Sequence, residues 1–417
     1  MVLSETILKK VSTAEAVSFH LWIMFAICLA ANIMAGGVST IMPVYLPVIT
    51  EDLLKSVPPE RIHNAGSFIN ATYIAGWTIG GFCWGIIADR FGRARSLSFA
   101  VSLFGLFTLL TAFVQSWELL LLFRLLSGFG VGGTLVMNTT LLSEVWPEKS
   151  RAIFVGMLSI GFPIGIISSG TLNYNIPEWR TGFLTGIIPL LIGLISFGLI
   201  KESEKWKAIR LQPHKQINLF KNSEIRINLI NGSIIFGSML IGLWAVFSWL
   251  PTWIQSLVND TRSVDERSLG MMVLGMGGLT GGFLSGWVGK ALGTRKAMML
   301  CFGGSFIMAL LLFKGNSEYS VIILPEIAML ALLFGISQGL MGYYIPLLFP
   351  VSIRATATGF CFNIGRIFTT AAVFFIGWLV TVLGGYGNSL FAFSFVFLAG
   401  FIVLLYSKKI TTTNGIH

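Results

Sequence analysis

Twelve long apolar segments run through this chain, and each is long enough to cross a lipid bilayer as a helix. A membrane-spanning helix needs about 20 apolar residues. The segments are 20–48, 66–88, 96–115, 118–141, 152–172, 181–200, 227–254, 268–289, 297–314, 321–347, 356–380 and 389–406. Only 11% of the 417 residues are charged, whereas soluble domains carry roughly 25%. The short alternating segments of a transmembrane β-barrel do not occur. The sequence therefore predicts an all-α polytopic membrane protein with 12 transmembrane helices.

The placement of the basic residues predicts how these helices are oriented. The net charge of +10 is compatible with nucleic-acid binding. However, most of the 28 Lys and Arg residues fall in segments on the same side of the membrane as the N-terminus. Lys and Arg are enriched in cytoplasmic loops. We therefore expect both termini in the cytoplasm, a lipid bilayer as the surrounding medium, and no nucleic-acid partner.

The Cys and His residues do not form the pattern of a metal site. The four cysteines lie within the predicted spans, and the four histidines lie at or beyond span ends. We therefore expect no metal and no other cofactor. A membrane-embedded enzyme would need a nucleophile, a metal or an acid–base set at mid-depth. The sequence shows none, so we expect that the chain is not an enzyme.

A polar segment over 201–226 divides the spans into two sets of six. Five motif positions of the first set have counterparts in the second: Gly85–Gly286, Gly92–Gly293, Pro147–Pro350 and Arg151–Arg354 keep the residue, and Lys290 stands where the first set has Asp89. Duplicated halves place a substrate path at their interface, near the membrane midplane. We predict a six-helix bundle over 1–200, a cytoplasmic linker over 201–226 and a second, pseudo-symmetric bundle over 227–417.

A charged turn over 85–95 joins the second and third spans. It resembles the signature G-x-x-x-D-R-x-G-R-[RK] of the major facilitator superfamily and departs from it only at Ala94. The resemblance implies that superfamily's fold, two pseudo-symmetric six-helix bundles that transport a substrate by alternating access. It also implies a monomer in the cytoplasmic (inner) membrane of a bacterium.

The same turn implies a gate on the cytoplasmic side. The Asp89 carboxylate faces the unfavourable negative end of its own helix dipole and needs another partner, such as Arg93, Arg151 or the start of the eleventh span. The last of these would join the two halves and stabilise the outward-open state. A tight turn that serves topology alone is the alternative. The expected gating residues are Gly85, Asp89, Arg90, Gly92, Arg93, Glu144, Arg151 and Arg354.

Two arginines lie well inside predicted spans. Arg366 is about nine residues into the eleventh span, roughly 14 Å deep, and Arg124 is about six residues into the fourth, roughly 9 Å deep. Charges at such depth are costly and mark functional sites. With no carboxylate at mid-depth, the cavity should be electropositive and favour an anionic substrate, whose carboxylate matches the guanidinium fork. Ion pairs that bridge helices are the alternative, such as one between Arg124 and Glu326.

Further substrate-binding candidates come from the helices that line the cavity in transporters of this kind. These are helices one, four, seven and ten, with one residue from helix two and Asn363 beside Arg366 on the eleventh. The candidates are Arg366, Asn363, Gln338, Asn32, Arg124, Tyr73 and Trp244. Hydrogen bonding between helices is the alternative for the polar ones, and packing for the tryptophan.

Three further segments, over 143–151, 177–206 and 357–367, resemble the sugar-porter and the aromatic-acid, sialate and organic-ion symporter branches. We expect proton-coupled uptake of a small, monocarboxylate-like organic anion. A neutral sugar or amino acid carrier, or an exporter of drugs or metabolites, is the alternative. Aromatic-acid symporters carry an Asp where helix one here has Ala31-Asn32-Ile33. The coupling proton, or Na⁺, is therefore assigned to Glu326, Glu118 or the substrate itself.

Overall fold

The computed structural model describes residues 18–54, 59–202, 223–258, 263–350 and 353–406. Within these ranges the side chains of 59–61, 89, 148–149, 151–153 and 354–355 are not described. Every regular element of the described residues is a helix, and they contain no strand. The helices are α2 (Phe19–Leu53), α3 (Pro59–Phe91), α4 (Arg93–Thr111), α5 (Trp117–Val145), α6 (Glu148–Asn175), α7 (Trp179–Leu184), α8 (Ile187–Leu199), α10 (Ser223–Leu257), α11 (Val264–Leu292), α12 (Thr294–Gly315), α13 (Ile323–Leu347), α14 (Arg354–Leu383) and α15 (Tyr386–Tyr406).

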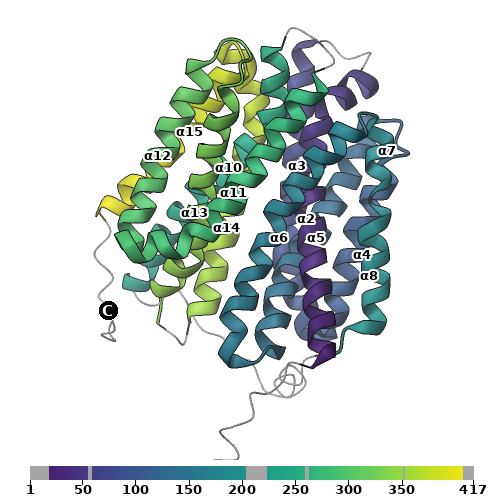
Figure 1. Ribbon diagram of the computed structural model, residues 1–417, viewed down its shortest axis with the longest axis vertical. Helices are drawn as coiled ribbons and strands as arrows, with labels where there is room; N and C mark the ends of the chain where they lie inside the picture. The colour runs from purple at the N-terminus through teal and green to yellow at the C-terminus, as the bar shows by residue number, and fades with distance from the viewer. Residues whose placement is uncertain (1–17, 55–58, 203–222, 259–262, 351–352, 407–417) are drawn as a thin grey trace, which may run out of the picture.

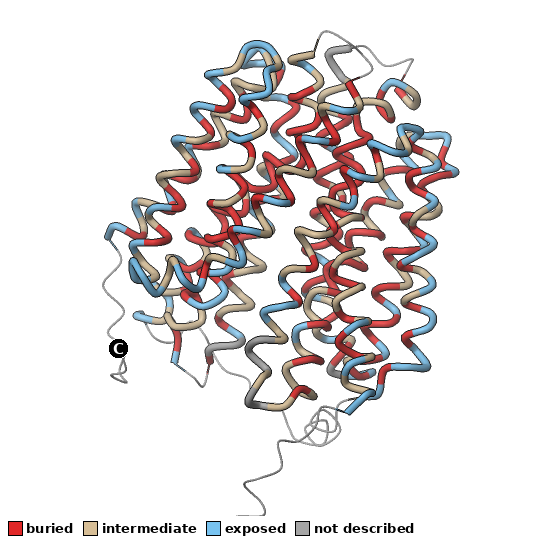
Figure 2. Tube along the Cα trace, viewed as in Figure 1, coloured by how far each residue is buried: buried red, intermediate tan, exposed pale blue. Residues whose placement is uncertain are grey.

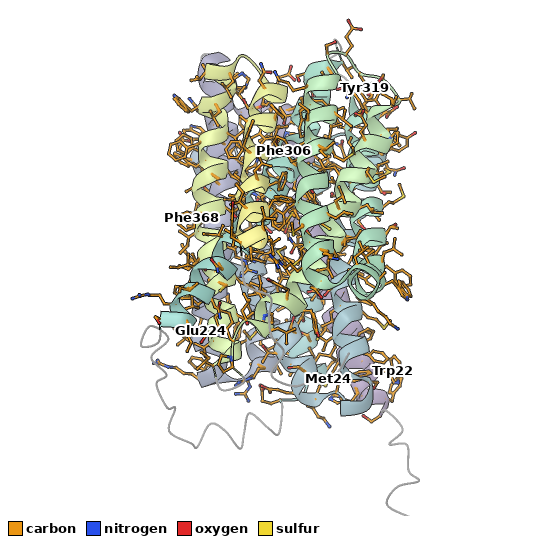
Figure 3. All side chains as sticks on the ribbon, turned by 90° about the vertical axis from the view of Figure 1, so that its left-hand side faces the viewer. Trp22, Met24, Glu224, Phe306, Tyr319 and Phe368 are labelled. Atoms are coloured by element: carbon orange, nitrogen blue, oxygen red, sulfur yellow. The ribbon has the colours of Figure 1, made fainter. Side chains whose placement is uncertain are left out.

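These helices form 12 spans that are long and apolar enough to cross a membrane. The short helix α7 and the helix α8 together make the sixth span, Trp179–Leu199. The predicted all-α fold with 12 membrane helices is therefore confirmed. An even number of spans places both ends of the described chain at one end of the bundle, called here the terminal end. Trp22 lies at the terminal end and Tyr319 at the opposite, far end (Figure 3).

The helices pack as two similar bundles that stand side by side (Figure 1). In the N-terminal half, α2 packs on α6, α3 on α5, and α4 on α8; in the C-terminal half, α10 packs on α14, α11 on α13, and α12 on α15. The same pairing in both halves reflects the internal repeat. The halves meet where α3 packs on α14, α6 on α11, and α2 on α10. The predicted linker over 201–226 falls mostly on 203–222, outside the described residues.

Close helix contacts depend on glycine at equivalent places in the two halves. A Cβ atom at Gly80 would overlap the carbonyl oxygen of Phe129, where α3 crosses α5. A Cβ at Gly281 would overlap the carbonyl oxygen of Leu332, where α11 crosses α13. Small residues allow backbones to approach in this way where no hydrophobic effect drives association.

Buried residues run through the interior of the bundle, and exposed residues lie mostly on its outside (Figure 2). Many of the exposed ones are large and apolar, including Phe283, Phe368 and Trp378, which are 63%, 61% and 56% exposed. In water such a surface would be an interaction site or an aggregation hazard, but in a bilayer it is the expected contact with lipid. In the described residues, no group of three or more His, Cys, Asp or Glu is placed to hold a metal.

Candidate functional site

Arg366 lies midway along α14, at the contact between the two halves. Its Nη1 donates a hydrogen bond of 3.3 Å to Oδ1 of Asn363, one turn earlier on the same helix. A Cβ added at Gly81 of α3 would lie 3.7 Å from Nη1, so the opposite half passes close by. No carboxylate of the described residues forms an ion pair with Arg366. Its charge is therefore available to an anion.

An aromatic cluster with members from both halves lies beside this charge. The Arg366 guanidinium carbon lies 5.7 Å from the ring centroid of Trp77, within the range of a cation–π contact. Trp77 of α3 meets Trp244 of α10 edge-to-face, with centroids 5.2 Å apart. Phe162 of α6 lies 5.9 Å from Trp77. The indole N–H of Trp77 is buried and has no hydrogen-bond partner in the described structure. The cluster therefore combines a cation, apolar ring faces and an unused donor.

Arg124 lies deeper in the N-terminal half, beyond Tyr73. Its side chain is 1% exposed, and its guanidinium carbon lies 4.0 Å from the Tyr73 ring centroid. Nη1 donates to the carbonyl oxygen of Val38 at 3.4 Å, and the Tyr73 hydroxyl is 2.7 Å from Ser39 Oγ. Tyr73 and Trp77 are 6.2 Å apart. The two arginines thus flank a Tyr73–Trp77 pair, and Arg124 is the one enclosed by protein.

The ion pair considered between Arg124 and Glu326 is not formed. Glu326 lies in the first turn of α13 and accepts a 2.7 Å hydrogen bond from Asn316 Nδ2 at the end of α12. Glu326 and Asn316 therefore bond to each other within the C-terminal half, at the far end. The internal repeat gives Glu326 and Arg124 nearly equivalent positions in the two halves. Equivalent positions in different halves are not neighbours in the structure, so these two side chains do not meet.

Asn32 and Asn138 hydrogen bond to each other and to the backbone. Asn32 Nδ2 donates to the carbonyl oxygen of Leu158 at 2.8 Å, and Asn138 Nδ2 donates to Asn32 Oδ1 at 2.8 Å and to the Cys28 carbonyl oxygen at 3.1 Å. This network joins α2, α5 and α6 inside the N-terminal half. Asn32 therefore forms hydrogen bonds between helices, which was the alternative to a role in substrate binding.

Gln338 on α13 is half-buried, and its Nε2 is buried with no hydrogen-bond partner in the described structure. Among the described groups, this leaves Gln338 with a donor that a ligand can use. Near Arg366, Thr370 donates its hydroxyl to the Arg366 carbonyl oxygen at 2.9 Å and lies 3.5 Å from the Thr78 hydroxyl of α3. These hydroxyls extend the polar surface beside the arginine.

The two halves are in contact at the far end. His63 Nδ1 of α3 lies 2.5 Å from the Tyr386 hydroxyl of α15, and a Cβ at Gly377 of α14 would lie 2.5 Å from the His63 carbonyl oxygen. Asn70 Nδ2 donates to the Ser248 carbonyl oxygen of α10 at 3.2 Å. These contacts close the path above the Arg366 cluster. None of these residues was predicted to have a gating role, because no local sequence pattern identifies a contact partner that lies 178 or 323 positions away.

The halves are not packed together in the same way toward the terminal end. A Cβ added at Gly85 on α3, or at Gly359 on α14, would meet no atom within 4 Å. Both glycines lie on the terminal side of the Arg366 cluster, on the two helices that touch at Gly81. The halves are therefore in contact at the far end, whereas no atom packs against these two positions toward the terminal end.

We expect Tyr386→Phe to weaken the far-end contact, because it removes the hydroxyl that bonds to His63. A neutral hydrogen bond contributes about 1 kcal/mol net, so the fraction open at the far end should rise about fivefold. The alkylation rate of a cysteine introduced at Ser67, which is 1% exposed, measures that fraction. An unchanged rate would show that the bond does not contribute to closure. Tyr406→Phe, on an exposed tyrosine far from the contact, is the matched control.

The charged turn at the terminal end is organised by a residue outside the signature. Glu202, just after the last turn of α8, accepts hydrogen bonds from the backbone N–H groups of Arg93, at 2.7 Å, and Ala94, at 3.2 and 3.1 Å. A carboxylate at this position neutralises the positive end of α4. Arg93 Nε also pairs with Glu144 Oε1 at 3.0 Å. The turn is thus tied to α5 and α8 of its own half.

Gly92 makes this arrangement possible. Its φ of +104° is one that other residues rarely adopt, and a Cβ there would overlap the Glu202 carboxylate. The expected roles of Gly92, Arg93 and Glu144 at the turn therefore have a defined geometry. The described contacts of this turn, Glu202 with Arg93 and Ala94 and Arg93 with Glu144, lie within the N-terminal half.

The remaining gating candidates are less constrained by the structure. The side chains of Asp89, Arg151 and Arg354 lie outside the described residues, so the predicted contact of Asp89 with the eleventh span stays a prediction. Arg90 is exposed at the end of α3. Of the coupling candidates, Glu118 is exposed in the first turn of α5, at the far end, and Glu326 is bonded to Asn316. The structure brings neither to the Arg366 cluster.

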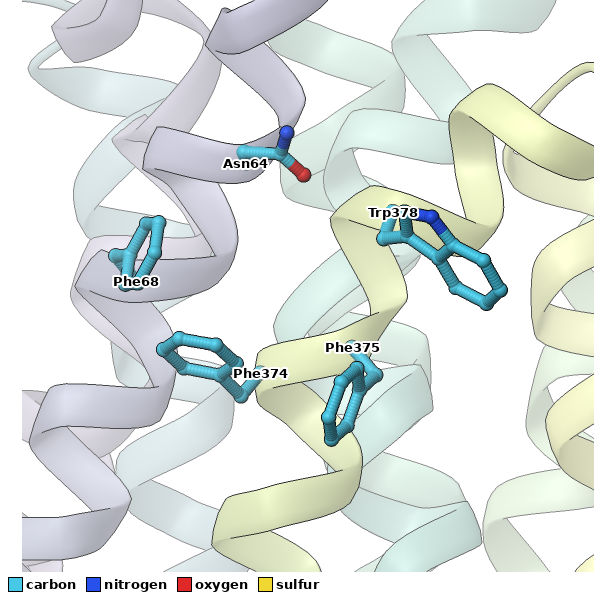
Figure 4. A pocket seen from close by; sticks show the side chains of 5 residues that line it. All are labelled: Asn64, Phe68, Phe374, Phe375 and Trp378. Carbon is cyan, nitrogen blue, oxygen red and sulfur yellow. The ribbon is translucent and has the colours of Figure 1, made fainter.

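A groove of about 320 Å³ lies on the outside of the α3–α14 contact, lined by Asn64, Phe68, Phe374, Phe375 and Trp378 (Figure 4). Phe68 and Phe374 meet edge-to-face across the two halves, at 4.4 Å. The four aromatic side chains are all among the exposed ones. None of the residues of the Arg366 cluster lines it, so this groove faces the surroundings of the bundle and is separate from the site between the halves.

Comparison with known proteins agrees with this architecture. A family model described as Major Facilitator Superfamily matches residues 27–367. The cis,cis-muconate transport protein of Acinetobacter baylyi is 28% identical over 74% of this chain and 76% of its own length. The 4-hydroxybenzoate transporter of Pseudomonas aeruginosa is 25% identical over 85% of each chain. The inward open structure of the xylose transporter from E. coli superposes with a TM-score of 0.75 at 17% identity, covering 93% of this chain and 96% of that one.

Proposed function

Since the chain belongs to the major facilitator superfamily, and is thus a membrane transporter rather than an enzyme, we propose that it takes up a small organic anion by proton-coupled alternating access. The observation that carries this proposal is the uncompensated charge of Arg366 between the two halves. A charge at mid-depth is expensive, and it is favourable only when a ligand or a partner neutralises it.

The chemistry of the Arg366 cluster favours a planar, unsaturated or aromatic carboxylate. A guanidinium binds a carboxylate through two parallel hydrogen bonds. The faces and edges of Trp77, Trp244 and Phe162 provide a site of matching shape and low polarity for a flat hydrocarbon part. Two of the relatives are named for transport of such compounds, cis,cis-muconate and 4-hydroxybenzoate. We therefore extend the predicted monocarboxylate class to aromatic acids and muconate-like diacids.

The conformation supports a path that opens alternately at its two ends. Contacts such as His63–Tyr386 close the far end, while no atom packs against Gly85 of α3 or Gly359 of α14. The distribution of Lys and Arg assigns the terminal end to the cytoplasm. On this assignment the state described here faces inward, in a bacterial cytoplasmic membrane. Substrate binding in the outward-facing state would require the far-end contacts to break.

The site residues that we propose to bind substrate are Arg366 and Trp77, with Trp244, Gln338 and Asn363 around them. Asn32, Arg124 and Tyr73 support the site from within the N-terminal half. The coupling proton remains assigned to Glu326, Glu118 or the substrate. If the substrate carries the proton, uptake needs no carboxylate at Arg366, which agrees with the absence of one in the described residues.

Thermal stabilisation of the purified protein by a panel of metabolites tests the substrate class, because a ligand of the folded state raises its stability. The panel contains benzoate, 4-hydroxybenzoate, cis,cis-muconate, lactate, xylose and an uncharged benzyl alcohol control. We expect stabilisation by the aromatic or unsaturated carboxylates and none by benzyl alcohol. Hits confined to xylose or other neutral compounds would contradict the anion and favour a neutral carrier.

Uptake into proteoliposomes with an imposed pH gradient then tests the coupling. We expect a carboxylate hit to accumulate when the outside is acidic, and to equilibrate without accumulation when an ionophore collapses the gradient. Accumulation driven by a Na⁺ gradient alone would contradict proton coupling. Accumulation under the opposite pH gradient, with the inside acidic, would indicate an exporter.

A further inference from the structure

A second buried arginine, Arg267, lies at the far end of the C-terminal half, in the first turn of α11 (Val264–Leu292). Its side chain is 0% exposed. Nη1 donates to Oε1 of Gln255 on α10. Nε and Nη2, which form the other edge of the guanidinium, have no hydrogen-bond partner in the described structure. That edge presents two parallel N–H groups, the geometry with which arginine binds anions.

Other unused donors accompany this edge, and one comes from the opposite half. Asn173 of α6 accepts a 2.9 Å hydrogen bond from Ser268, the neighbour of Arg267, and its Nδ2 is buried without a partner. Tyr45 of α2 donates its hydroxyl to the carbonyl oxygen of Ile176, three residues after Asn173, so α2 also packs beside this part of α6. The Ser263 hydroxyl, at the N-cap of α11, is also buried and unpartnered. Donors without acceptors therefore gather where α6 and α11 meet.

The positive charge of this cluster has no direct counter-charge in the described residues. Glu266 interacts electrostatically with Arg267, but the described residues include no carboxylate in an ion pair with it. The N-terminus of α11 adds its own positive potential. Buried charges in proteins are paired or neutralised, and buried donors are almost always bonded. An anion that the chain does not itself supply would satisfy both requirements.

We propose that Arg267, Asn173 and Ser263 hold a small inorganic anion, of the size of chloride, when the far end is closed. We choose a small ion because α6 and α11 pack closely beside the cluster. A Cβ added at Gly170 of α6 would lie only 2.7 Å from the Ser268 carbonyl oxygen of α11. This site is separate from the Arg366 cluster, and the inference does not depend on the proposed substrate.

Because the donors come from both halves, the anion would stabilise the state in which those halves touch at the far end. Opening that end would separate Asn173 from Arg267 and release the anion to solvent. By linkage, an anion that favours the closed state is itself bound more tightly by that state. Chloride would then adjust the balance between the two conformations without being transported.

The test measures the melting temperature of the purified protein, without substrate, as chloride replaces gluconate at constant ionic strength. We expect the wild type to gain about 2 °C or more, saturably, as expected when a ligand binds the folded state. Arg267→Gln should abolish the gain. Arg366→Gln, at the arginine of the separate cluster between the halves, should keep it. A wild type that melts alike in both salts would show that water alone fills the cluster and would overturn the proposal.

A second variant keeps the proposal testable if Arg267→Gln does not fold. Asn173→Asp replaces the unused Nδ2 donor by a carboxylate oxygen and so supplies the missing negative charge. In gluconate it should be as stable as the wild type in chloride, and it should no longer respond to chloride. A variant that still gains stability from chloride as the wild type does would contradict the site. An Asn173→Asp variant that is less stable than the wild type in gluconate would also contradict the site.

Discussion

Arg366→Gln should lower the affinity for an organic-anion substrate by about 100-fold, corresponding to about 3 kcal/mol. The Arg366 guanidinium can form two charge-assisted hydrogen bonds with a carboxylate, and each such bond contributes about 1.5–3 kcal/mol. Glutamine keeps similar length and polarity but carries no charge. The affinity of the purified variant for the carboxylate that stabilises the wild type best, measured by calorimetry, checks this.

Two companion variants separate binding from structure. Arg366→Lys keeps the charge without the fork, so it should recover part of the affinity, with a loss of about tenfold instead. Arg124→Gln should lower the melting temperature, because it removes the contact with Tyr73 and the bond to Val38, while the folded fraction keeps its affinity. If Arg366→Gln binds as the wild type does, the arginine is structural. If Arg124→Gln alone loses affinity, the binding site has been assigned to the wrong arginine.

Gly92→Ala should be the most destabilising change in the charged turn, with a cost of about 3 kcal/mol. A side chain at φ +104° is strained by about 1–3 kcal/mol. The added Cβ would also displace the Glu202 carboxylate, so its hydrogen bonds to the N-terminus of α4 would be lost. The melting temperature in detergent should fall by about 6 °C or more, and transport should fall with it.

Gly293, the equivalent of Gly92 in the second half, is the matched control. It also has positive φ, +78°, but a Cβ there would meet no atom within 4 Å. Gly293→Ala should therefore show the backbone strain alone, about 1 kcal/mol. Equal losses for the two variants would show that the Glu202 contact adds nothing. Glu202→Gln should lower the stability by about the difference between the losses caused by Gly92→Ala and Gly293→Ala.

The turn shows how far local sequence could be interpreted. The spacing of Gly85, Asp89, Gly92 and Arg93 was enough to predict a tight charged turn and its family. The partner Glu202 could not be predicted from the turn, because it lies 109 positions from Arg93 and reaches it only when α8 packs on α4. The pairing of Arg93 with Glu144 depends on the same packing.

The buried polar residues show what the local sequence could not predict. Sequence identified Arg124, Arg366, Asn32 and Gln338 as unusual within apolar spans but could not tell ligand-facing groups from structural ones. The fold separates them, because Asn32 and Arg124 find partners inside one half. Arg366 instead lies where the halves meet, without a counter-charge in the described residues. Arg267 lies one residue before the predicted span 268–289, yet the fold buries it, because α11 begins already at Val264.

Length and hydropathy by themselves determined that this chain spans a membrane 12 times, because every backbone polar group in lipid must be satisfied within a helix. The internal repeat and the charged turn determined its family. Tertiary structure alone decided which end is closed, which arginine faces the path, and which donors stay unused. Those properties depend on contacts between halves, such as His63 with Tyr386. No local pattern encodes such contacts, since the two side chains meet only after both bundles have formed.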